Sequence, residues 1–199
     1  MSAEFFPPFS GLDYEVRTTP SVENAGLMFA GSVRRLHTGF IDILWLEDDA
    51  GCEAWLDTLI PYVKVGRIGK LGVKTSSLET ARKFREVLHE EGLDGPAVWG
   101  CFMREPRLLD WCRDYSTKFF SDWSRKDYAR VCGLEAVKEL AVKHNVKPGQ
   151  IITAWSIAGG TIPVEGINTL EALSDAVKSA DIKLTLDEVR TINEEAAKA

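Results

Sequence analysis

The chain has 199 residues, of which 45% are hydrophobic and 27% charged, a composition typical of a globular protein with one sizeable core. Its net charge of −6 and its scattered Lys and Arg residues argue against nucleic-acid binding, which requires a clustered basic surface. The sequence shows no signal peptide and no apolar run long enough to span a membrane, so we expect a cytoplasmic protein without membrane or nucleic-acid partners.

Residues 1–20 are rich in proline and show no periodicity, which predicts an irregular N-terminal arm. We expect one domain over residues 21–199. Apolar residues at helical spacing predict helices over residues 21–36, 53–66, 78–92, 105–116, 134–146, 147–160, 169–180 and 184–199. Short apolar runs predict strands over residues 41–46, 70–73, 97–103 and 161–166, whereas residues 117–133 carry mixed signals.

Helix ends are marked by residues with suitable chemistry. Ser21 and Ser77 are N-cap candidates, and Thr185 forms a predicted capping box with the glutamate three residues later. Gly66 can terminate the second helix, in which Pro61 should introduce a kink or a break.

Strands and helices alternate along the chain, which predicts a parallel sheet covered by helices. A closed barrel of eight such units usually needs about 250 residues. We therefore expect an α/β protein with a partial or reduced (β/α)8 TIM-barrel-like fold.

Several strings resemble the second half of the aldo-keto reductases in order. They are SVRRLHTGFIDILWLE, GRIGKLGVKTSSLET, LLDWCRD and the segment from VKELAVKHNVKPGQ to IKLTLDEV. The last string is the most specific. The resemblance covers residue 21 to the C-terminus and implies a (β/α)8 barrel, NADPH as hydride donor and reduction of a small-molecule carbonyl ligand.

The resemblance also shows departures at the catalytic positions. The family's catalytic Asp, Tyr and Lys lie on strands that precede the matched segment. Its catalytic His ends the fourth strand, where this chain has Glu47. Catalytic activity is therefore doubtful on this reading, and Glu47 is the one catalytic candidate.

The cofactor contacts differ from the family after the fifth and sixth strands. Lys74 and Thr75 replace a Ser-Asn pair, and Trp99-Gly100 replaces an Asn-Gln pair. The family's seventh strand should follow residue 116, where it looks shortened or deleted.

The loop after the last strand differs as well. Gly166 is kept and can offer backbone N–H groups to a phosphate. Asn168 and Ala172 stand where the family often has Arg, and Ala176 where it has Asn. We predict a cofactor site comprising Lys74, Thr75, Gly166 and Asn168, with NADP binding that is weak or lost.

Glu47, Asp48 and Asp49 form an acidic triplet at the end of the first predicted strand. Glu47 can be read as a general base, or the triplet as a solvated loop before a helix N-terminus, which favours negative charge. The triplet has no histidine nearby to complete a ligand set, and the cysteines have no zinc-site spacing, so we predict no metal. The three histidines and Lys74 are interpreted as surface residues.

Two further functions stay open beside an NADP-linked oxidoreductase. One is a non-catalytic truncated barrel that acts as a binding or assembly module, and the other is a non-redox enzyme that reuses the pocket. An open sheet of about four strands leaves unpaired edges, which predicts a homodimer or a complex that covers the open side.

Overall fold

A computed structural model describes residues 2–4, 22–47 and 52–198 of the chain. They form two compact units, which are described separately. Unit 1 comprises Met1–Trp99 and Trp111–Thr117, and unit 2 comprises Gly100–Asp110 and Lys118–Ala199. The single domain expected over residues 21–199 stays a prediction, and the predicted cap Ser21 lies outside the described residues.

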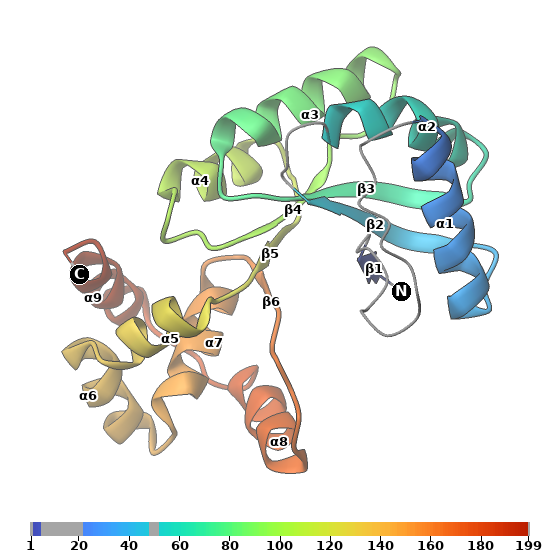
Figure 1. The fold of residues 1–199 in the computed structure, drawn as a ribbon. Helices are drawn as coiled ribbons and strands as arrows, with labels where there is room; N and C mark the ends of the chain where they lie inside the picture. The colour runs from blue at the N-terminus through green and yellow to red at the C-terminus, as the bar shows by residue number, and fades with distance from the viewer. Residues whose placement is uncertain (1, 5–21, 48–51, 199) are drawn as a thin grey trace. The chain divides into compact units, whose positions relative to one another are not determined.

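Unit 1 contains parallel strands that pair in chain order. These strands are β1 (Ser2–Glu4), β2 (Ile41–Glu47), β3 (Ile68–Lys74) and β4 (Ala97–Gly100). In Figure 1, helices α2 and α3 lie along one face of β2 and β3. The stretch expected to be an irregular arm thus contributes the short strand β1.

The helices of unit 1 begin and end close to the predicted residues. They are α1 (Val22–Leu36), α2 (Cys52–Lys64) and α3 (Leu78–Glu90), followed by α4 (Pro106–Asp114), whose residues are shared between the two units. Ser77 caps α3 by accepting a hydrogen bond from the Thr80 N–H at 3.2 Å. Gly66 has the positive φ of 72° that a chain reversal after α2 requires. Pro61 lies inside α2 without splitting it.

The core of unit 1 packs between the strands and helices α2 and α3. Leu44, Val73 and Phe84 are fully buried. Gly72 faces Trp45 in the β2–β3 register, and a Cβ atom at Gly72 would overlap the indole ring. A glycine is therefore required for Trp45 to lie across β3.

Unit 2 has two short strands and five helices among its described residues. The strands β5 (Phe119–Ser121) and β6 (Ile162–Pro163) are parallel. The helices are α5 (Arg125–Cys132), α6 (Glu135–His144), α7 (Pro148–Ala158), α8 (Leu170–Ser179) and α9 (Leu186–Ala196).

Helix α7 is the centre of unit 2. It contacts α5, α6, α8 and β6, and all of its residues from Gln150 to Ser156 are buried. A helix with buried residues on successive turns must be surrounded by other elements, and the apolar Ile151, Ile152 and Trp155 make up much of the buried surface of α7. The Trp155 indole N–H donates a hydrogen bond to Asn193 Oδ1 at 2.9 Å, which ties α7 to α9.

Two carboxylates of α9 hold both ends of α6. Glu195 accepts hydrogen bonds at 2.8 Å from the Glu135 and Ala136 N–H groups, which have no partner within the helix. The buried Glu188 accepts hydrogen bonds from Lys143 at 2.8 Å and pairs with His144 Nε2 at 2.9 Å. Helix α6 is thus fixed at its N-terminus and its C-terminus by α9.

The structure corrects several expectations from the sequence. The seventh strand of the family pattern is not deleted, because β5 occupies the mixed segment, although it has only three residues. The strand expected over residues 161–166 is reduced to Ile162–Pro163, and the one over 97–103 ends at Gly100, where a turn begins. His144 is not a surface residue, because its side chain is 23% exposed and pairs with Glu188.

Two features are absent from the described residues. Among the described helices, none has the length and the apolar composition needed to cross a membrane. In the same part of the chain, no three His, Cys, Asp or Glu side chains are grouped as metal ligands.

Glu188 should make the stability of the protein sensitive to acid. Burial raises the pKa of its carboxyl, but hydrogen bonds from Lys143, Thr185 and His144 outweigh that effect and lower the pKa to about 2. Because the folded pKa lies below the unfolded value, the stabilisation is complete above about pH 4.5 and is lost as the pH falls towards 2. Urea unfolding should show a loss on the order of 1–2 kcal/mol between about pH 5 and pH 3 from this group.

Glu188→Gln should be less stable than the native protein near neutral pH and should lack this part of the acid response. The control is Glu194→Gln on the same helix, whose side chain is 65% exposed. Equal acid responses in Glu188→Gln and the native protein would contradict the assignment.

Candidate functional site

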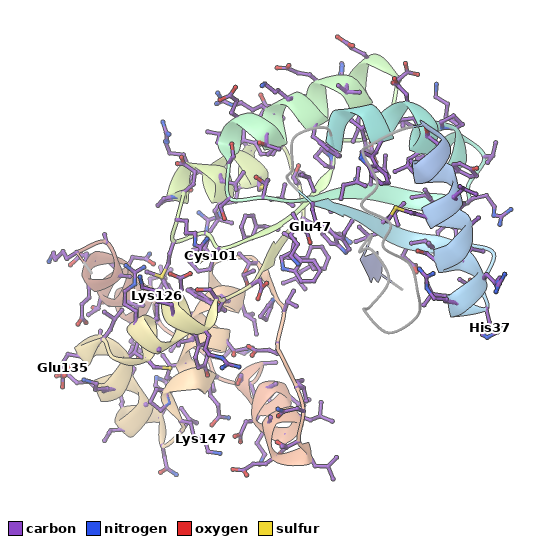
Figure 2. All side chains as sticks on the ribbon, viewed as in Figure 1. His37, Glu47, Cys101, Lys126, Glu135 and Lys147 are labelled. Atoms are coloured by element: carbon purple, nitrogen blue, oxygen red, sulfur yellow. The ribbon has the colours of Figure 1, made fainter. Side chains whose placement is uncertain are left out.

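A row of three side chains lies at the C-terminal ends of the strands of unit 1. Glu47, Lys74 and Trp99 are register partners on β2, β3 and β4. Lys74 Nζ lies 3.4 Å from Glu47 Oε1 and 4.6 Å from the centre of the Trp99 ring. The parallel register therefore creates an ion pair and a cation–π contact in one line. Figure 2 labels Glu47 at the end of β2.

The Glu47–Lys74 pair corrects two readings of the sequence. Glu47 is the last residue of β2 and is not part of a solvated loop, while Asp48 and Asp49 lie outside the described residues. Lys74 is the last residue of β3, with 26% of its side chain exposed, and is not a free surface lysine.

Thr75 is committed to the turn that follows β3. It is buried, its N–H donates to the Trp99 carbonyl at 2.9 Å, and its Oγ1 accepts a hydrogen bond from the Ser77 N–H at 2.9 Å. Its described contacts are thus those of a residue that shapes the start of α3.

A second candidate site is a pocket of about 590 Å³ that lies wholly within unit 2. One part of its wall follows β5 and includes Asp122, Trp123 and Tyr128. Another part follows β6 and includes Glu165 and Gly166. In parallel α/β folds this end of the strands is where ligands bind, and phosphate sites often lie in the loops after the last two barrel strands.

Helices α7 and α8 form the rest of the pocket wall. Helix α7 contributes Gln150 and Thr153, and helix α8 contributes Ala172, Asp175 and Ala176. The polar groups of this wall already have partners: Gln150 Nε2 donates to the Asp175 carbonyl at 3.2 Å, and Thr153 Oγ1 lies 2.6 Å from Glu165 Oε1. The pocket is therefore largely pre-formed.

The pocket lining carries a net negative charge. Three carboxylates, of Asp122, Glu165 and Asp175, face two cations, of Arg125 and Lys147, which leaves one net negative charge. Lys147, labelled in Figure 2, places its Nζ 2.7 Å from Asp175 and 2.6 Å from Glu171. Hydrogen bonds to Asp175 and then to Glu171 raise the pKa of the Lys147 ammonium. Its positive charge is thus matched by two carboxylates of α8.

An aromatic cluster backs the pocket. The Trp123 ring lies 5.3 Å from Phe102 and 5.8 Å from Trp155, measured between ring centres. The Trp123 indole N–H is buried and has no hydrogen-bond partner among the described residues. The pocket wall therefore includes an aromatic ring that packs against a larger aromatic cluster.

Of the four residues predicted to bind the cofactor, Gly166 lies in the lining of this pocket. Gly166 lines the pocket with Ala172 and Ala176, two positions where the resemblance implied altered phosphate contacts. Asn168 is exposed and does not line it. Glu47, Lys74 and Thr75 belong to unit 1, which is described separately.

Sequence reasoning missed Trp123, Tyr128, Glu165 and Asp175 as pocket residues. Glu165 directly precedes Gly166, so the sequence already showed a negative charge in the predicted phosphate loop. Trp123 and Tyr128 lie in the segment with mixed signals, where no pattern pointed to a site.

The residues present do not fit a phosphate of NADPH. A phosphate site needs positive charge or a surplus of backbone N–H groups. Here Lys147 is matched by Glu171 and Asp175, and Glu165 adds negative charge next to Gly166. The lining thus lacks the positive charge that a phosphate needs.

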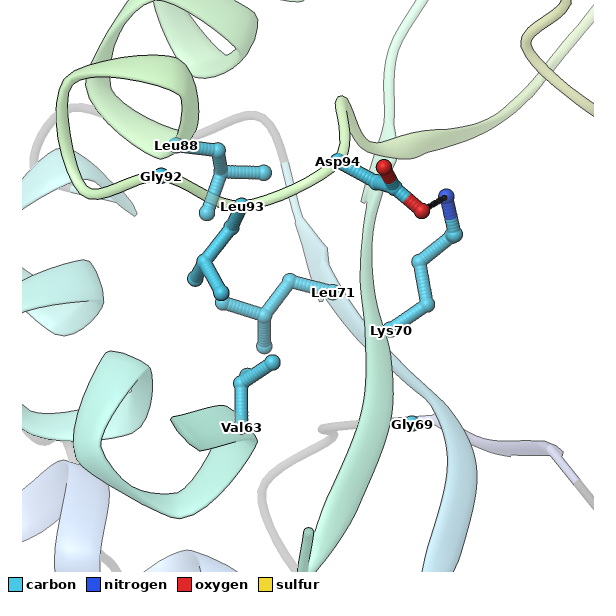
Figure 3. Close-up of a pocket in the computed structure, with 8 residues that line it drawn as sticks. All are labelled: Val63, Gly69, Lys70, Leu71, Leu88, Gly92, Leu93 and Asp94. Carbon is cyan, nitrogen blue, oxygen red and sulfur yellow. Dashed lines mark ion pairs between the residues drawn. The ribbon is translucent and has the colours of Figure 1, made fainter. Parts of the chain in front are cut away.

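A smaller cavity of about 260 Å³ lies in unit 1 near the N-terminal half of β3. Figure 3 shows that its wall is made mainly of apolar side chains such as Leu71, Leu88 and Leu93. Its charged groups pair with each other, because Lys70 Nζ lies 3.8 Å from Asp94 Oδ2. This end of barrel strands serves stability, so we assign the cavity no chemistry.

Curated proteins with similar sequences include reductases and putative aryl-alcohol dehydrogenases. No family model matches the chain. Methylglyoxal reductase DkgB of Escherichia coli O157:H7 is 19% identical over 167 residues, covering 81% of this chain and 62% of that protein. Aldo-keto reductase str7 of Strobilurus tenacellus is 38% identical over 58 residues, covering 28% of this chain and 17% of that protein. The chain thus spans less than two thirds of the length of these curated relatives.

Solved structures of aldo-keto reductases share the fold. MGS-M4, an aldo-keto reductase from a deep-sea metagenome library, has a TM-score of 0.80 at 15% identity. The match covers 92% of this chain and 69% of the MGS-M4 chain. A mutant of Gox0644 in complex with NADPH has a TM-score of 0.75 at 17% identity. The match covers 88% of this chain and 66% of the Gox0644 chain. These likenesses confirm the predicted partial α/β barrel of parallel strands and surrounding helices. In sequence and in fold, this chain is thus similar to aldo-keto reductases.

Proposed function

We propose that this chain is an oxidoreductase-type protein of the aldo-keto reductase kind that binds a nicotinamide dinucleotide weakly through the pocket of unit 2. The observation that carries this proposal is the position of the pocket, after β5 and β6 and against the start of α8. A relative with this fold has been solved in complex with NADPH, which supports a dinucleotide as ligand. The matched charge of Lys147 and the added charge of Glu165 are the reason for the weak binding.

The groups at the strand ends of unit 1 argue against efficient carbonyl reduction. Reduction requires a group that donates a proton to the carbonyl oxygen as hydride reaches the carbon. Glu47 is paired with the Lys74 ammonium, and the resemblance matches no residue of this chain to the catalytic Asp, Tyr and Lys of the family. We therefore propose that the chain does not complete the reaction with the residues described.

A non-catalytic binding module is the second candidate function. The Glu47–Lys74 ion pair favours this candidate, because these two side chains bind each other and are not poised for proton transfer. A pocket that binds nucleotide without turnover distinguishes this candidate from a working reductase. The cytoplasmic location expected from the sequence stays a prediction.

The chain should show no reduction of 4-nitrobenzaldehyde by NADPH above background. Loss of a general acid typically costs about 10²–10⁴-fold in rate. Following NADPH absorbance with the native protein and with Glu47→Ala and Lys74→Ala tests this expectation, and all three should match the background. Turnover in the native protein that either variant abolishes would show that the Glu47–Lys74 pair forms a rebuilt catalytic site.

Gly166→Val should weaken dinucleotide binding by at least about tenfold because it adds a branched side chain to the pocket lining. The fold should tolerate the change, since a Cβ atom at Gly166 meets no atom within 4 Å. The control is Gly39→Val in unit 1, where a Cβ atom likewise meets nothing within 4 Å. Calorimetric titration and thermal unfolding give the two readouts, and unchanged binding in Gly166→Val would place the ligand elsewhere.

We also propose that the chain forms a homodimer. Helix α8 and the loop before it expose apolar side chains at helical spacing: Leu170 is 86% exposed, Val177 64% and Leu173 45%. An exposed apolar stripe of this kind marks a site of association, and a two-fold dimer is the commonest solution among soluble proteins.

Light scattering at micromolar concentration should give about twice the chain mass of 22.1 kDa. Replacing both Leu173 and Val177 by lysine should return the mass to that of one chain, because two charges in the stripe cannot be buried unpaired. The control is Lys178→Glu, an exposed change of charge on the same helix. A native protein that stays monomeric at all concentrations would refute the dimer.

A further inference from the structure

Two exposed segments of unit 1 meet at the edge of the sheet where β2 and β3 begin. They are residues 34–40, which lead into β2, and residues 64–67, which lead into β3. Because the two strands are parallel and paired in register, the segments that precede them lie at the same edge. The Ile41 N–H donates to the Arg67 carbonyl at 3.0 Å, which ties them together. Figure 2 labels His37, which lies in the first segment.

These segments carry a surplus of positive charge, although the whole chain has a net charge of −6. Residues 34–42 and 64–67 contain four Lys or Arg side chains, those of three arginines and of Lys64, and one carboxylate, that of Asp42. Lys64 is matched by Glu91 at 2.7 Å. The surplus therefore lies on the three arginines.

The arginines Arg34, Arg35 and Arg67 are exposed, and in the described part of the chain none of them lies within 4.0 Å of a carboxylate oxygen. Arg35 donates to Ser32 Oγ at 3.3 Å, and Arg67 Nε donates to the Gly39 carbonyl at 2.5 Å. The terminal nitrogens of Arg67 are thus left for a bidentate pair with a carboxylate. A helix C-terminus favours cations, which accounts for the two arginines of α1 but not for Arg67.

Apolar side chains are exposed in the same two segments. Leu36 is 37% exposed, Phe40 41% and Val65 71%. A Cβ atom at Gly69 would come within 3.0 Å of Phe40 Cζ, so the missing side chain lets the Phe40 ring lie across β3. Single exposed apolar residues are common on protein surfaces, but a group of them beside unpaired arginines is typical of an interface. A partner must therefore offer apolar as well as acidic groups.

The size of the charge surplus favours a protein segment over a nucleic acid or a membrane. Binding to a nucleic acid or to an anionic membrane grows with the number of cations that reach the phosphates. Three arginines near Asp42, in an acidic chain, provide few such contacts. Arginine forks match single carboxylates, and the exposed apolar side chains can be covered by apolar side chains of the same segment.

We propose that a basic patch, formed by Arg34, Arg35, Leu36, Phe40, Val65 and Arg67, docks an acidic segment of another protein. Carboxylates of the partner pair with Arg35 and Arg67, and its apolar side chains cover Phe40 and Val65. The basic patch belongs to unit 1, so this inference is independent of the dinucleotide proposed for the pocket of unit 2.

Fluorescence anisotropy of the native chain with a fluorescein-labelled peptide of alternating glutamate and leucine tests the docking site. The peptide should bind, and its affinity should fall at least about threefold between low and physiological ionic strength, because salt screens exposed charges. A peptide of alternating glutamate and serine should bind more weakly. A peptide of alternating lysine and leucine should not bind.

Variants locate the binding surface. Arg35→Glu and Arg67→Glu should each weaken binding of the glutamate–leucine peptide at least about fivefold, because attraction becomes repulsion. The matched control is Arg82→Glu on the exposed side of α3, which should change the affinity less than about twofold. Val65→Ser should weaken binding about threefold, whereas Leu27→Ser, at a side chain that is 63% exposed on α1, should not. Thermal unfolding checks that each variant is folded.

The outcomes are decisive in either direction. Equal affinity in the native chain and in both arginine variants overturns the docking site, as does failure of the glutamate–leucine peptide to bind at submillimolar concentration. Equal binding of the glutamate–serine peptide overturns the role of the apolar side chains. Vesicles that contain phosphatidylserine and a short single-stranded RNA are the remaining probes. If either binds more tightly than the peptide and Arg67→Glu abolishes that binding, the basic patch serves a membrane or a nucleic acid, and the acidic segment is wrong.

Discussion

The burial of α7 is the constraint on which the architecture of unit 2 depends. A helix with buried residues on successive turns gains its stability only when α5, α6 and α8 cover it, and fully buried side chains such as Ile151 and Ile152 are worth roughly 1.5–3 kcal/mol each. The same arrangement brings the first turns of α7 against α8 and the loop after β6. The pocket wall is thus a consequence of core packing, which explains why its polar groups, such as Gln150, are held in fixed hydrogen bonds.

Electrostatics decides what this pocket can hold. The ion pairs of Lys147 with Glu171 and Asp175 stabilise the contact between α7 and α8, but they also remove the cation that a phosphate needs. Exposed ion pairs of this kind contribute little to stability. In the proposed function their larger effect is on binding, because these pairs and Glu165 leave the pocket lining without the positive charge that a phosphate needs.

At the strand ends of unit 1, the charged side chains also pair with each other. Register alone places Glu47, Lys74 and Trp99 in a row, since neighbouring parallel strands bring equivalent positions to the same edge. Lys74 is shared between the Glu47 carboxylate and the face of Trp99. In the proposed function, unit 2 binds the nucleotide. The row of Glu47, Lys74 and Trp99 in unit 1 has a structural role at the strand ends, where catalytic residues usually lie in this fold.

The sequence by itself determined the alternation of strands and helices, the α/β class and the resemblance to the aldo-keto reductases, because periodicity and capping act over a few residues. The capping box at Thr185 and the reversal at Gly66 are examples. Only the tertiary structure decided that β5 exists, since three residues give no periodic signal and depend on pairing with β6. Contacts between distant segments also decided that His144 is paired, that Lys74 is bound to Glu47, and that Glu165 lies in a pocket with Trp123. Such pairings depend on which side chains the packed core brings within a few ångströms, and local sequence does not encode that distance.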